Sequence, residues 1–123
     1  MVSYVLIVDD EEPIRRFLER RLQTWGYRVK HAEGAQEALE MMELEPASIA
    51  IIDIRMPGRD GIWLTSQVRR LWPATAVIIA TGADDLDEID VKDLGVFDHV
   101  RKPFNQVLLR QLLDDARKAI EPA

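Results

Sequence analysis

The chain has 123 residues, enough for one domain, and its 47% hydrophobic and 31% charged residues are an ordinary globular composition. No apolar run approaches the roughly 20 residues that a membrane-spanning helix needs, and the lack of cysteine excludes disulfides and thiolate metal sites. The formal net charge of -6 argues against unaided nucleic-acid binding, which depends on Lys and Arg at phosphates. Since no secretory signal is evident at the start, we expect a cytoplasmic protein.

The first half of the sequence alternates between strand and helix patterns. The expected elements are a strand over 4–8, a helix over 13–25, a strand over 27–31, a helix over 35–44 and a strand over 49–52. The first and third strands are wholly apolar, which is typical of strands buried on both faces of a parallel sheet. Pro13 suits the first turn of the first helix, and Gly26 is expected to end it.

The second half continues the same alternation. After a loop rich in Pro and Gly, the expected elements are a helix over 62–71, a strand over 75–80, a helix over 84–94, a strand over 97–100 and a helix over 104–116. The helix over 84–94 is the weakest prediction, because it carries six acidic residues against the single Lys92 and like charges at helical spacing destabilise a helix. This segment could be short, mobile or stabilised by a basic partner, or it could simply be a solvated acidic helix.

Five strand–helix units without a linker or repeat predict one α/β domain over residues 1–123. Its sheet is expected to be parallel and covered by helices on both faces. In such sheets ligands bind beyond the carboxyl ends of the strands. Four of the predicted strands end at chemically active groups, namely Asp9-Asp10, Asp53, Thr81-Gly82 and Lys102.

These groups predict a cation site with a nucleophilic carboxylate. Three carboxylates at one edge repel one another unless a cation neutralises them, and oxygen ligands of this kind suit Mg²⁺. A metal, a carboxylate and fixed hydroxyl and ammonium donors together indicate phosphoryl transfer to an aspartate. Taken singly, each group also has a structural interpretation, since Asp9 and Asp10 could cap the first helix and Lys102 could be a surface charge.

The sequence resembles the receiver domain (CheY-like) family of two-component response regulators, which are bacterial signalling proteins, over essentially its whole length. The matching motifs are Val8-Asp9-Asp10-Glu11, Asp53-Ile54-Arg55-Met56-Pro57-Gly58 with Asp60-Gly61, Thr81-Gly82 and Lys102-Pro103-Phe104. The resemblance implies a flavodoxin-like, doubly wound five-stranded parallel sheet in the order 2-1-3-4-5. It also implies a phosphoprotein whose aspartyl phosphate is formed in a phosphorelay.

By this resemblance, Asp53 is the phosphoacceptor and takes its phosphoryl group from a histidine kinase or a phosphotransfer protein. Asp10 and Asp53 are expected to bind Mg²⁺, for which Mn²⁺ can substitute. Asp9 is expected to help through water, and the backbone carbonyl of Arg55 to complete the protein ligands. The Arg55 side chain occupies a position that tunes dephosphorylation in the family.

The resemblance assigns the remaining site residues to phosphoryl binding and switching. Thr81 is expected to hydrogen-bond the phosphoryl group, Gly82 to leave room for it, and Lys102 to pair with it, while Pro103 is expected to follow a cis peptide bond. Thr81 and His99 are the expected switch residues. The family usually has Tyr or Phe at the position of His99, and an imidazole there would add pH sensitivity unless it is only a surface residue.

The output of the domain is expected on the face made by 84–94, 97–100 and the last helix. We expect an unidentified partner or effector domain there, with its contact through the acidic segment 84–94, and homodimerisation through the same face stays open. Direct nucleic-acid or membrane binding is not expected. Nor do we expect an enzyme with an external substrate, because the domain would promote only the phosphorylation and dephosphorylation of its own Asp53.

Two other functions compete with this interpretation. A haloacid dehalogenase-type phosphatase also places an Asp after a strand, but it needs a second Asp two residues on, where this chain has Arg55. A receiver-like scaffold that no longer takes phosphate would usually lack an acid, the Thr or the Lys. Incubation with acetyl phosphate and Mg²⁺ distinguishes a receiver from a scaffold, because a scaffold stays unmodified.

Overall fold

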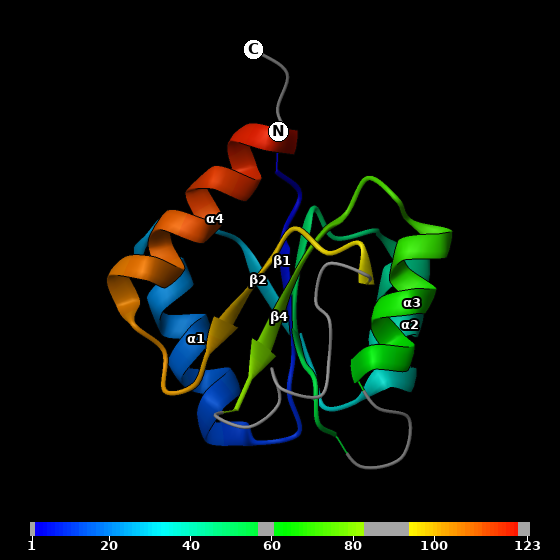
Figure 1. The fold of residues 1–123 in the computed structure, drawn as a ribbon, viewed down its shortest axis with the longest axis horizontal. Coiled ribbons are helices and arrows are strands. Elements are labelled where there is room, and N and C mark those ends of the chain that lie inside the picture. The colour runs from blue at the N-terminus through cyan, green and yellow to red at the C-terminus, as the bar shows by residue number, and fades with distance from the viewer. Residues whose placement is uncertain (1, 57–60, 83–93, 121–123) are drawn as a thin grey trace.

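The computed structural model describes residues 2–56, 61–82 and 94–120. It has three layers, with one parallel sheet between two layers of helices (Figure 1). The sheet has the order β2-β1-β3-β4-β5, which confirms the predicted doubly wound topology. Its strands are β1 (Val5–Val8), β2 (Val29–Ala32), β3 (Ile49–Asp53), β4 (Ala76–Thr81) and β5 (Asp98–Arg101). The described helices are α1 (Glu12–Thr24), α2 (Ala35–Leu44), α3 (Gly61–Leu71) and α4 (Gln106–Ile120).

Each face of the sheet has its own hydrophobic core. Alternate residues of β1 point to opposite faces, so Leu6 and Val8 pack in the core under α2 and α3, while Val5 and Ile7 pack in the core under α1 and α4. Every residue of β1 and β3 is buried. Burying one large aliphatic side chain contributes roughly 1.5–3 kcal/mol, so these two central strands contribute strongly to the stability of the fold.

The strand register brings the predicted site residues to one edge. Val8 pairs with Ile52 across β1 and β3, and Asp53 pairs with Ala80 across β3 and β4. Thr81 in turn pairs with Arg101 on β5. Since all strands run in the same direction, the residues that follow them emerge side by side at the carboxyl edge of the sheet.

The element boundaries differ from the predicted ones by a few residues, for identifiable reasons. β2 begins only at Val29 because the Tyr27 N–H still donates to the Leu22 carbonyl of α1 at 2.9 Å. α4 begins at Gln106 because Asn105 caps it, with Oδ1 accepting from the Leu108 N–H at 3.1 Å.

The predicted helix over 84–94 lies outside the described residues apart from Leu94. Within the described ranges, no helix combines the length and apolar character needed to cross a membrane.

Candidate functional site

Three carboxylates converge at the carboxyl edge of the sheet. Oxygen atoms of Asp9, Asp10 and Asp53 all lie within 4.8 Å of one another. Asp9 and Asp53 are only 2% and 7% exposed, whereas Asp10 is exposed to solvent. Asp9 and Asp10 follow β1 and Asp53 ends β3, so two adjacent central strands aim these side chains at one point. The sequence predicted this grouping.

Lys102 joins the acid cluster from the end of β5. Its Nζ lies 2.8 Å from Asp9 Oδ2 and 3.5 Å from Asp53 Oδ2, so one ammonium contacts both buried carboxylates. The Lys102 N–H donates to the Thr81 carbonyl at 2.8 Å, which ties this residue to β4. The peptide bond between Lys102 and Pro103 is cis.

Burial and the neighbouring charges together shift the pKa values of Asp53 and Lys102. Burial raises the pKa of Asp53 to about 6, and the neighbouring Asp9 adds to the rise while Lys102 opposes it. Burial alone would lower the pKa of Lys102, but its contacts with Asp9 and Asp53 outweigh that effect and raise it. The lysine therefore stays charged while Asp53 ionises with difficulty. A cluster of carboxylate oxygens in this condition suits a hard divalent cation such as Mg²⁺.

The backbone around Asp53 holds its carboxylate in place. The Arg55 N–H donates to Asp53 Oδ1 at 3.3 Å, and the Ile54 N–H donates to the Ala80 carbonyl at 3.1 Å. Gly61 packs against this turn so closely that a Cβ there would overlap the Asp53 carbonyl oxygen. Gly61 is thus a residue on which the Asp53 conformation depends, and the sequence alone showed it only as part of a motif.

Thr81 ends β4 next to Lys102, and His99 lies on the neighbouring strand β5. Thr81 is fully buried, and its hydroxyl donates to the Val100 carbonyl at 3.4 Å, so in this state it bonds to the neighbouring strand. His99 is paired with Ile79 across the two strands, and its Nδ1 lies 3.4 Å from Asp98 Oδ1. Gly82 follows Thr81 directly and is partly exposed. The charged contact of His99 is therefore with Asp98 on its own strand.

Arg15 is a residue of the site that sequence reasoning missed. Its side chain is buried at 6% exposure, and its Nη1 donates to the Asp9 carbonyl at 2.8 Å. The available signal was its place on the apolar stripe of α1, three and seven residues before Leu18 and Leu22. An arginine on a stripe that faces the core is unusual and marks a buried polar contact.

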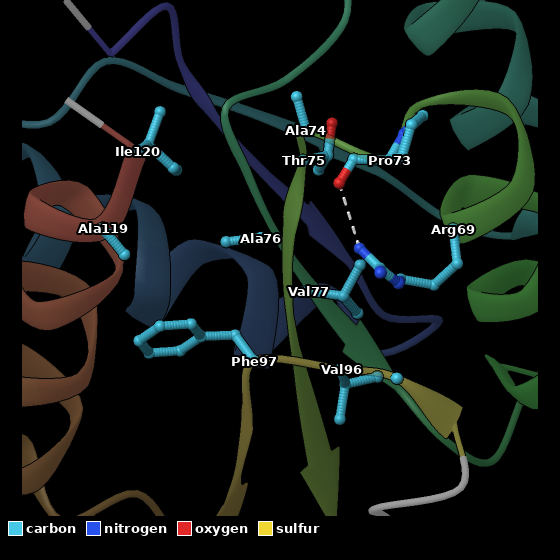
Figure 2. Close-up of a pocket in the computed structure, with 11 residues that line it drawn as sticks. Arg69, Pro73, Ala74, Thr75, Ala76, Val77, Val96, Phe97, Ala119 and Ile120 are labelled. Carbon is cyan, nitrogen blue, oxygen red and sulfur yellow. Dashed lines mark hydrogen bonds between the residues drawn. The ribbon is translucent and has the colours of Figure 1, made fainter. Parts of the chain in front are cut away.

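A hollow of about 430 Å³ lies at the opposite, amino end of β4 and β5 (Figure 2). Its lining is largely apolar and includes Val77, Val96 and Phe97, and the guanidinium of Arg69 donates to the Pro73 carbonyl at 3.1 Å. None of the predicted site residues lines it. Of these two places, the carboxyl edge of the sheet is therefore the candidate functional site, and the hollow is not.

Comparisons with known proteins identify the family of this chain. The family model described as the response regulator receiver domain matches residues 5–114. Among curated proteins, the transcriptional regulatory protein GlrR of Escherichia coli K12 is 33% identical over 122 residues. That match covers 98% of this chain but only 28% of the relative, so the chain spans little more than a quarter of that protein.

Solved structures show the same fold. A response regulator receiver domain protein from Clostridium thermocellum has a TM-score of 0.88 at 29% identity, covering 97% of this chain and 98% of that one. The Vibrio cholerae chemotaxis protein CheY4 has a TM-score of 0.83 at 27% identity, covering 94% and 99% respectively. The chain therefore belongs to the response regulator receiver domain family, the CheY-like receivers of two-component systems.

Proposed function

We propose that residues 1–123 form a single receiver domain that accepts a phosphoryl group on Asp53 from a histidine kinase or a phosphotransfer protein. The observation that carries the proposal is the buried Asp53 carboxylate beside Asp9 and Asp10, with Lys102 Nζ reaching both buried acids. A buried nucleophile next to a cation site and a fixed ammonium is what phosphoryl transfer to a carboxylate requires.

The cation site in this proposal consists of Asp9, Asp10 and Asp53, completed by the backbone carbonyl of Arg55. Mg²⁺ bound there, or Mn²⁺ in its place, would neutralise charge on the phosphoryl oxygens. The exposure of Asp10 leaves the site open on one side, which suits an ion that keeps several waters and recruits a phosphate oxygen.

In the transfer, a carboxylate oxygen of Asp53 forms a bond to phosphorus as the phosphorus–nitrogen bond of the phosphohistidine donor breaks, and the imidazole nitrogen keeps the electron pair. The Arg55 N–H holds Oδ1 of Asp53, so the nucleophile is oriented beforehand. Lys102 stays protonated because its pKa is raised, and its ammonium can move from the carboxylates to the new phosphoryl oxygens.

The phosphoryl group would then act on β5 through Thr81. The Thr81 hydroxyl bonds to the Val100 carbonyl in this state, and a phosphoryl oxygen near Asp53 would compete for that donor. Loss of the bond would free the strand that carries His99, and with it the output face expected from β5, α4 and the segment 84–94. A local change in charge would thus be coupled to a movable element.

The same proposal covers the role of the domain in the cell. We infer that it works in the cytoplasm, passes its signal by protein contact to a partner or effector domain, and turns over no external substrate. Its relative GlrR is named a transcriptional regulatory protein, so an effector that controls transcription is one candidate output. Self-association through the output face would fit equally well.

The test is intact mass spectrometry after incubation with acetyl phosphate, with MgCl2 or with EDTA. Wild type should gain one phosphoryl group only with Mg²⁺, and Asp53→Asn should gain none. Asp115→Asn, which removes an exposed carboxylate on α4, is the matched control and should behave as wild type. A folded wild type that stays unmodified would instead support the phosphate-independent scaffold.

A further inference from the structure

Arg15 places a positive charge against the backbone of Asp9, one member of the acid cluster. Its Nη1 donates to the carbonyl of Asp9 at 2.8 Å, and its Nη2 lies 3.8 Å from Glu33 Oε1. The contact with Asp9 is the closer of the two. The guanidinium is buried, whereas its partner Glu33 is 75% exposed. Arg15 belongs to the first turns of α1, which follow the Asp9-Asp10 pair.

This contact completes the fixation of Asp9. The Asp9 N–H donates to the Ala32 carbonyl at 3.2 Å, Oδ1 accepts from the Glu11 N–H at 2.9 Å, and Oδ2 accepts from Lys102 at 2.8 Å. With Arg15 on its carbonyl, every polar group of Asp9 has a partner. The backbone that carries Asp9 on to Asp10 therefore cannot rotate without breaking one of these bonds.

Burying Arg15 lowers the stability of the fold compared with burying an apolar residue at the same position. Its Nε is buried without a hydrogen-bond partner among the described residues, and an unpaired buried polar atom is costly. Neighbours on the same helical stripe are leucines, and an apolar residue at position 15 would avoid that cost. Groups that orient the ligands of a metal, in contrast, contribute to metal affinity even where they do not touch the ion.

We propose that Arg15 is a positioning residue for the cation site, acting through the Asp9 carbonyl to hold the Asp9-Asp10 pair in its binding conformation. This inference rests on the proposed function, because it needs a cation at the acid cluster. The direction in which Mg²⁺ affinity changes when Arg15 is removed distinguishes this role from a simple charge effect. If the arginine were only a nearby positive charge, its removal would strengthen Mg²⁺ binding, whereas loss of a positioning contact weakens it.

The test is titration calorimetry with MgCl2 on the full chain, together with thermal unfolding of each variant to confirm folding. Arg15→Met should bind Mg²⁺ about tenfold or more weakly than wild type, in line with the effect of other residues that orient metal ligands. Arg15→Lys keeps the charge but its ammonium falls short of the Nη1 position, so its affinity should lie between the two, about threefold below wild type.

The matched control is Arg16→Met, which removes the same charge one residue on. Arg16 is 69% exposed and pairs with Glu12 at 2.6 Å, so its loss should leave Mg²⁺ affinity within about twofold of wild type. A folded Arg15→Met that binds Mg²⁺ as tightly as wild type, or more tightly, overturns the inference. If that variant does not fold, Arg15→Lys decides by the same criterion. A wild type that binds no Mg²⁺ would instead overturn the cation site itself.

Discussion

Asp53 is a buried carboxylate that destabilises the fold when it ionises. Burial raises its pKa to about 6 from 3.8, so between about pH 4 and 6 the folded state binds more protons than the unfolded state, and stability falls as pH rises. In EDTA near pH 7.5, Asp53→Asn should therefore unfold with a free energy about 1–3 kcal/mol higher than wild type, since one pKa unit corresponds to about 1.4 kcal/mol.

Urea denaturation as a function of pH checks this prediction. The gain from Asp53→Asn should shrink as pH falls through about 6 and be nearly gone at about pH 3, below the unfolded-state pKa of 3.8, where Asp53 is protonated in both states. A gain that stays constant over this range would mean that the substitution acts through packing rather than through charge. Asp115→Asn, on the exposed side of α4, should show no such pH-dependent gain.

Lys102 is the counter-charge of the acid cluster. Lys102→Met keeps most of the side-chain volume but leaves Asp9, which is buried, without the ammonium at 2.8 Å. The free energy of unfolding near neutral pH should drop by about 1–3 kcal/mol, the usual cost of an unsatisfied buried polar group. Lys118→Met, on an exposed position of α4, is the control and should change stability by less than about 0.5 kcal/mol. Equal losses in the two variants would contradict this role.

Most of the site residues were predictable because of where they stand in the sequence. Asp53, Thr81 and Lys102 end or follow apolar runs, and parallel strands bring such positions together. The place of Arg15 on the apolar stripe of α1 marks it as a buried polar residue, but only the folded chain shows that its guanidinium reaches the Asp9 carbonyl. Distances such as that from Lys102 to the two acids depend in the same way on tertiary packing.

The turn between β3 and α3 depends on close backbone contact. A Cβ on Gly61 would overlap the Asp53 carbonyl, so Gly61→Ala must displace the phosphoacceptor strand end or the first turn of α3. We expect a loss of about 1–3 kcal/mol in the free energy of unfolding. Gly34→Ala is the control, because a Cβ there meets nothing within 4 Å, and its cost at the start of α2 should stay below about 1 kcal/mol. Urea denaturation measures both, and equal costs would contradict this packing.

The strands and helices followed from sequence periodicity, but their ends did not. Apolar runs identified β1 and β3 because these strands are buried on both faces. The start of α4 was misplaced at Phe104, because the decisive group is the Asn105 side chain, whose cap on the Leu108 N–H is visible only in the fold. Tyr27 was predicted in β2 for a similar reason, since the bond from its N–H to the Leu22 carbonyl is visible only in the fold.

The domain as a unit should be stabilised by the cation that it is proposed to bind. A ligand that binds only the folded state adds about 2.7 kcal/mol when its concentration is a hundred times its dissociation constant. Saturating MgCl2 should therefore raise the melting temperature of wild type relative to EDTA, and raise that of Asp53→Asn by much less. Calorimetric or fluorescence-monitored melting checks this. An equal rise in both proteins would indicate a general salt effect.

The location of the phosphoryl group is the deciding measurement. Wild type treated with acetyl phosphate and MgCl2 would be digested under mild acid conditions and the modified peptide sequenced by tandem mass spectrometry. We expect a single phosphoryl group on Asp53, the buried acid that Lys102 contacts at the carboxyl edge of the sheet. A phosphoryl group on any other residue, or none on folded protein, would contradict it.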